Sequence, residues 1–159
     1  MTQEHILTVR NADIIQQVEV RTFKFGKARD NGQADKLINN VKLTDMPYDR
    51  SMVYGWIRTA IGNIKEAFAK YSCCIETEYE QGAESENDDN LVTHLHFCLS
   101  SKWPQCNGES FDNDCKEYIV NAVVSDFLGL SLPREADLYS QKAMLALKNA
   151  ERKLYYKKA

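Results

Sequence analysis

One long amphipathic segment limits what this chain can fold into. Residues 49–71 repeat apolar side chains at spacings of three and four, which marks one helix face over about five turns. The members of this face are Val53, Trp56, Ile57, Ala60, Ile61, Ile64, Ala67, Phe68 and Tyr71. Other elements have to cover such a face, so the segment predicts a packing surface rather than a reaction site.

Length and composition fit one domain. At 159 residues the chain is long enough to bury a single core and too short for two domains of ordinary size. Apolar residues make up 43% and charged residues 27%, which is typical of a globular protein and not of a disordered one. We therefore expect residues 1–159 to form a single helical domain.

Three further segments have helical patterns. Asn11 can cap a helix that runs to about Phe25, after a short β-prone run at residues 6–9. Ser110 can cap a helix that stops near residue 129. The last helix begins at Pro133, with acidic residues in its first turn and Lys and Arg at its end, as the helix dipole favours.

The hydrophobic period changes to two between residues 72 and 100. Residues 73–80 alternate apolar side chains with glutamates, which predicts a strand with one wet face. Residues 91–99 form its partner, and the acidic segment 81–90 suits an exposed hairpin loop. The predicted fold class is therefore mainly α, a four-helix bundle-like domain with a β-hairpin insertion at about residues 72–100.

Charge is distributed unevenly along the chain. The net charge of -3 gives no general attraction to nucleic acid. Residues 76–89 contain no Lys or Arg and hold the carboxylates of Glu76, Glu78, Glu80, Glu84, Glu86, Asp88 and Asp89. The C-terminal stretch is basic, with Lys142, Lys148, Arg152, Lys153, Lys157 and Lys158. Opposite patches of this kind can align neighbouring copies, while the alternative is two solvated faces.

Nothing in the sequence indicates a membrane span or a signal peptide, because no run of 18 apolar residues is present. We therefore expect a cytosolic protein. Its 5 cysteines include the adjacent pair Cys73 and Cys74 and form no obvious disulfide framework, so we expect thiols. Cys73 and Cys115 fall on predicted core faces, where a thiol acts as a small hydrophobic group.

The strongest candidates for chemistry are His94, His96 and Cys98, which share one face of the second strand. Imidazole and thiolate are suitable Zn²⁺ ligands, but neither CxxC nor HExxH spacing is present, and the alternative is a polar strand face. Asp112 and Asp114 lie at a predicted helix start, where carboxylates are stabilising without any acid-base role. The sequence therefore predicts no catalytic residue, no cofactor and no metal ion, and a protein that is not an enzyme.

Three aromatic residues lie where burial within one subunit is not assured. They are Trp103, Tyr155 and Tyr156. Tyr and Trp are common anchors at protein interfaces because they bury much area with few rotatable bonds. Contact with a partner and local packing both remain open for these side chains.

The order of elements resembles a known class of virion proteins. The features that carry the resemblance are the helix end at residues 22–28 (TFKFGKA), the helix start at residues 48–50 (YDR), the hairpin insertion, and the closing helical pair with residues 136–139 and 148–152. Together they resemble small structural proteins of phages and prophages of gut Bacteroidetes, and the head-tail connector, or neck, class of tailed phages.

The resemblance implies a mechanical role. Copies of the chain would contact one another head to tail and close as a ring that bridges portal and tail, in the virion and, before assembly, in the host cytoplasm. The hairpin carboxylates of Glu84, Glu86, Asp88 and Asp89 would face the DNA channel, with passive contact and no specific binding. Arg152 and Lys153 would meet an acidic neighbour or the portal. A second hypothesis is a small cytosolic adaptor or regulatory binding protein that acts through the acidic hairpin.

Overall fold

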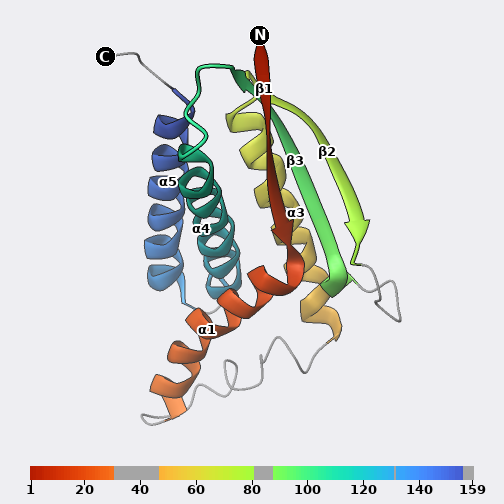
Figure 1. The fold of residues 1–159 in the computed structure, drawn as a ribbon. Helices are drawn as coiled ribbons and strands as arrows, with labels where there is room; N and C mark the ends of the chain where they lie inside the picture. The colour runs from red at the N-terminus through yellow and green to blue at the C-terminus, as the bar shows by residue number, and fades with distance from the viewer. Residues whose placement is uncertain (31–46, 81–87, 131, 156–159) are drawn as a thin grey trace.

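Helices and an antiparallel sheet together form the described part of the computed structural model, which comprises residues 1–30, 47–80, 88–130 and 132–155. The elements in these ranges are β1 (Thr2–Arg10), α1 (Asn11–Asp30), α3 (Pro47–Ala67), β2 (Ser72–Tyr79), the short 3₁₀ helix η1 (Asp88–Asn90), β3 (Leu91–Ser100), α4 (Asn107–Leu128) and α5 (Pro133–Leu154). Figure 1 shows α3 behind the sheet, α4 beside α3 and β1, and α5 on the far side of α4.

The sheet contains one strand more than the predicted hairpin. β3 is central in the order β1-β3-β2, and both neighbours run antiparallel to it. β1 pairs with β3 along its whole length, and β2 pairs on the other side with a β-bulge between Ser72 and Cys74. The described fold is therefore mixed α/β, which corrects the predicted four-helix bundle with a hairpin insertion. A two-stranded hairpin is marginal in water, and β1 supplies the third strand that stabilises it.

One hydrophobic core lies between the inner face of the sheet and the helices. Its largest fully buried side chains include Leu7, Leu95, Phe97 and Leu99 from the sheet, Ile57 and Ile64 from α3, and Phe111, Ile119 and Leu128 from α4. α4 packs against α1, α3 and α5, so it buries even the consecutive residues 118–121. A helix that is covered on several sides is apolar around most of its circumference.

The predicted helices are present with shifted ends. The packing face predicted for residues 49–71 is confirmed for Val53, Ile57, Ala60, Ile61, Ile64 and Phe68, which are buried, and Trp56 and Tyr71 are partly buried against them. The prediction is wrong for Ala67, which is exposed where α3 ends. α5 begins at Pro133 as predicted, and α4 begins at Asn107, before Ser110. The predicted end of α1 near Phe25 is wrong, since the helix continues to Asp30. A glycine such as Gly26 costs a helix about 1 kcal/mol without having to end it. No helix in the described ranges is long and apolar enough to cross a bilayer.

Candidate functional site

The outer face of the sheet carries histidines on β3 between carboxylates on both neighbouring strands. His94 is one of them. Its Nε2 lies 2.9 Å from Glu78 Oε1 on β2, and its Nδ1 lies 3.0 Å from Thr8 Oγ1 on β1. Both ring nitrogens of His94 therefore have partners within the sheet.

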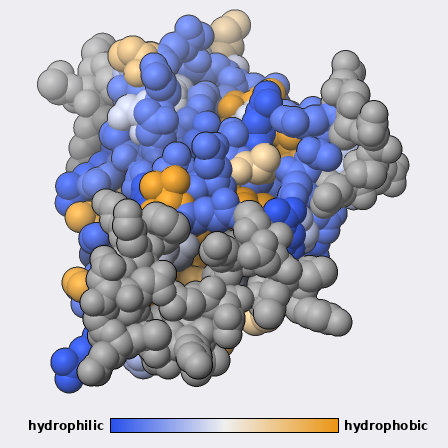
Figure 2. All heavy atoms as spheres, turned by 90° about the horizontal axis from the view of Figure 1, so that it is seen from below, coloured by the Kyte–Doolittle hydropathy of each residue, from blue (hydrophilic) through white to orange (hydrophobic). Residues whose placement is uncertain are grey.

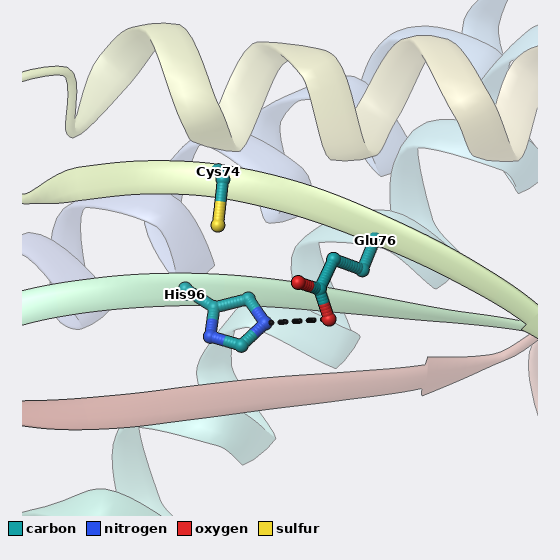
Figure 3. A group of neighbouring side chains, drawn as sticks. All are labelled: Cys74, Glu76 and His96. Carbon is teal, nitrogen blue, oxygen red and sulfur yellow. Dashed lines mark ion pairs between the residues drawn. The ribbon is translucent and has the colours of Figure 1, made fainter.

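His96 is placed differently, because carboxylates of both neighbouring strands contact its two ring nitrogens. Its Nδ1 is hydrogen bonded to the Glu4 carboxylate, and its Nε2 forms an ion pair with Glu76 Oε2 of β2 at 3.3 Å (Figure 3). The hydrogen bond to Glu4 raises the pKa of His96, burial opposes this rise, and the negative charge of Glu76 adds to it. Cys74 stands directly opposite His96 in the β2–β3 pairing.

These neighbours form a group that could hold a metal ion. Figure 3 shows the side chains of Cys74, Glu76 and His96 gathered over β2 and β3. Their sulfur, oxygen and nitrogen ligand atoms all lie within 4.8 Å of one another. Of the three residues proposed from sequence, His96 belongs to this group and His94 does not.

Cys98 is also outside the group, since it forms a disulfide with Cys73. Their Cα atoms are 6.4 Å apart, and the β-bulge at Cys73 lets its sulfur reach β3. The expectation that all cysteines are thiols is therefore wrong for this pair, and Cys73 is exposed rather than part of the core. Cys115 is fully buried as predicted, and burial raises the pKa of its thiol well above the ordinary value.

A groove opens on the inner side of β2. It is lined by Ile57, Ile61 and Gly62 of α3 and by Ile75 of β2, with a cavity volume of about 290 Å³. Because the helices do not reach this edge of the sheet, Ile75 is 36% exposed and Tyr79 is 40% exposed. The prediction that only one face of β2 is exposed to solvent is wrong, since residues 73–79 are exposed on both faces of the strand.

α5 presents a second exposed surface. Leu138, Met144 and Leu145 are 56%, 51% and 58% exposed, and the neighbouring Lys148 and Arg152 are exposed as well. Figure 1 places α5 and β2 on opposite sides of the molecule. On the lower face in Figure 2, the coloured apolar atoms form separate small groups within a largely hydrophilic surface.

No family model, curated protein or solved structure matches this chain. The function therefore has to be inferred from the surfaces and side-chain groups just described. Among these, the groove beside β2 and the exposed face of α5 are the extended features, and the group around His96 is a local one.

The predicted interface residues occupy different environments. Trp103 is 4% exposed, and its Nε1 donates to the Lys153 carbonyl oxygen at 2.7 Å, so it packs within its own chain. Lys153 forms an ion pair with Asp114 of α4. Tyr155 is 50% exposed, and Arg152 is exposed, so both are accessible to a partner. Glu84, Glu86 and Tyr156 lie outside the described residues.

Asp88 and Asp89 connect η1 to the helices. The Asp88 carbonyl oxygen accepts from Asn11 Nδ2 at 2.9 Å, which holds η1 against the start of α1. The Asp89 carboxylate accepts hydrogen bonds from Arg50 and Tyr54 of α3. These contacts give the Asp89 carboxylate and the Asp88 backbone a structural role within the chain. Burial, followed by the hydrogen bond to Asp89, raises the pKa of Tyr54 to about 12 from its ordinary value of 10.0.

The raised pKa of Tyr54 predicts a specific alkaline effect. The folded state keeps the phenol proton at pH values where the unfolded state loses it, so this contribution to stability is complete below pH 10.0 and lost toward about 12. We expect Tyr54→Phe to make the free energy of unfolding fall less steeply across this window. Urea denaturation at several pH values measures the slope, and identical slopes in the two proteins would contradict the assignment.

Proposed function

We propose that this protein is a structural assembly subunit whose copies associate head to tail, in the manner of a head-tail connector ring between portal and tail. The observation that supports this best is the pair of different surfaces that belong to β2 and to α5, two elements on opposite sides of the molecule (Figure 1). One is the groove beside β2, and the other is the exposed face of α5. Contact between unlike surfaces repeats from copy to copy and closes as a ring when the rotation permits.

Apolar side chains on the two surfaces match one another. In the groove Ile75 is accessible to a partner, above a floor formed by the buried Ile57 and Ile61. α5 offers Leu138 and Leu145, which are seven residues apart and therefore on one helix face. An amphipathic helix that lays its apolar face into an apolar groove is a recurring mode of protein recognition. We infer that α5 of one copy occupies the groove of the next.

The strand beside the groove and α5 also carry opposite charges. Glu76, Glu78 and Glu80 follow one another along the outer face of β2 and the residue after it, on the other side of this edge strand from the groove. The C-terminal half of α5 exposes Lys148 and Arg152. Such charges steer association and select its orientation, and their effect decreases with added salt.

A charge-swap experiment tests this proposal. Glu78→Lys with Glu80→Lys reverses the acidic surface, and Lys148→Glu with Arg152→Glu reverses the basic one. Because like charges then face each other, we expect each double variant to associate more than about tenfold more weakly than the wild type. Sedimentation velocity over a concentration series at low salt measures this association.

The matched control is a mixture of the two variants. In the mixture each reversed surface again meets a surface of opposite charge, so association should return, and high salt should weaken it. A wild type that stays monomeric across the series, or a mixture no more associated than its components, would contradict head-to-tail assembly. The adaptor hypothesis depends on the acidic hairpin loop at residues 81–90, of which residues 81–87 lie outside the described part of the chain.

A further inference from the structure

We propose that Cys74, Glu76 and His96 bind a Zn²⁺ ion on the outer face of the sheet. Cys74 lies directly opposite His96, and Glu76 is two residues further along β2 on the same face. Their ligand atoms lie within 4.8 Å of one another (Figure 3). Since Zn²⁺ binds nitrogen and oxygen at about 2.0 Å and sulfur at about 2.3 Å, small side-chain adjustments bring all three ligand atoms around one ion.

The orientation of His96 supports this inference most directly. The Glu4 carboxylate holds Nδ1, which leaves Nε2 as the nitrogen that faces Cys74 and Glu76. Nε2 is buried and forms an ion pair with Glu76 Oε2 at 3.3 Å, while no partner within the described residues meets hydrogen-bond geometry with it. On binding, Zn²⁺ would take the place of the Nε2 proton, which passes to the solvent, and would contact both the imidazole nitrogen and the Glu76 carboxylate.

Glu4 then acts as the outer partner of a metal-binding histidine. Histidine ligands usually donate their second ring N–H to a carboxylate, which sets the tautomer and the ring orientation. Glu4 lies on β1, His96 on β3 and Glu76 on β2, so all three strands contribute to the arrangement. The register of the sheet therefore orients the ligand before any ion is bound.

The mixture of donor atoms selects the kind of metal. Thiolate, imidazole and carboxylate together suit Zn²⁺, whereas Ca²⁺ and Mg²⁺ prefer oxygen ligands alone. Cys98 is held in the disulfide with Cys73, so the thiolate comes from Cys74, whose proton passes to the solvent on binding. Three protein ligands leave one position for water. This site lies on the face opposite the groove beside β2 and does not depend on the assembly proposed above.

Metal titration of the full chain with its disulfide intact tests the site. Co²⁺ serves as a coloured substitute for Zn²⁺, and we expect thiolate-to-cobalt absorption together with the bands of a tetrahedral ion. Zn²⁺ should displace Co²⁺ at one equivalent per chain, with affinity measured by calorimetry. Cys74→Ser and His96→Asn should weaken Zn²⁺ binding by more than about tenfold, and Glu4→Gln by about 10–100-fold.

Two neighbouring residues provide matched controls. His94→Asn changes the other histidine of the same strand face, and Cys106→Ser removes another exposed thiol. Both variants should keep wild-type Zn²⁺ affinity and the cobalt spectrum. Absence of thiolate-to-cobalt absorption in the wild type would overturn the proposal, as would wild-type affinity in Cys74→Ser. Circular dichroism of each variant checks that the fold is retained, so that a loss of binding reports on the ligands.

Discussion

Replacing Phe111 with alanine is expected to lower the free energy of unfolding by about 3–5 kcal/mol. The Phe111 side chain is 0% exposed, and its ring centroid lies 5.2 Å from that of Phe97 and 6.0 Å from that of Phe68. These rings come from α4, from β3 and from the turn after α3, so the substitution removes contacts among three parts of the core. Domains are typically stable by only about 5–15 kcal/mol, which makes this a large fraction of the total.

Urea denaturation followed by circular dichroism measures the effect. Leu145→Ala is the control, because Leu145 is 58% exposed and its loss should change stability by no more than about 0.5 kcal/mol in the monomer. Phe111→Leu retains apolar volume and should fall between the two. If Phe111→Ala were as stable as Leu145→Ala, the aromatic cluster would not be the centre of the core.

The helices were predictable from sequence because their signals are local. In α3 the spacing of Ile57, Ile61 and Ile64 indicates the buried face, and each of the three is buried. The start of α5 follows from Pro133, whose fixed φ suits the first turn. The helix ends were less predictable, because Gly26 and Ser110 fit helix interiors as well as helix boundaries.

The sheet was only partly predictable, because its third strand pairs over a long sequence separation. The β-prone run at residues 6–9 indicates a strand, but its partner is not visible from the run itself. Leu7 pairs with Leu95, which brings the N-terminus beside a strand far along the chain. A two-stranded hairpin with one apolar face needs support from other elements of the fold. The local sequence pattern does not show whether helices alone or a third strand as well provide that support.

Locating the group of Cys74, Glu76 and His96 requires the register between β2 and β3 in addition to the alternating pattern within each strand. The alternating pattern places Cys74 and Glu76 on one polar strand face and His94 and His96 on another. Pairing of the two strands brings these polar faces to the same side of the sheet, a signal that the sequence contained. The choice of Cys74 as the partner of His96 depends on the bulge at Cys73, which no spacing rule locates.

The second large effect is expected at Gly108, near the start of α4. An alanine Cβ there would lie 2.9 Å from His5 Cε1 and 3.8 Å from Trp103 Cη2. His5 cannot easily withdraw, because its Nε2 lies 2.7 Å from Asp112 Oδ1 and its ring centroid lies 5.3 Å from that of Trp103. We therefore expect Gly108→Ala to lower the free energy of unfolding by about 1–3 kcal/mol through overpacking.

Gly62→Ala is the matched control for Gly108→Ala. An alanine Cβ at position 62 meets no atom within 4 Å, so the substitution only reduces the backbone freedom of the unfolded chain and favours α3. We expect a gain of about 0.5–1 kcal/mol there. Because the two substitutions are chemically identical and both lie in helices, opposite signs in urea denaturation would isolate the close approach of His5 to α4. A gain at both positions would show that His5 moves aside without cost and does not fix the packing of β1 on α4.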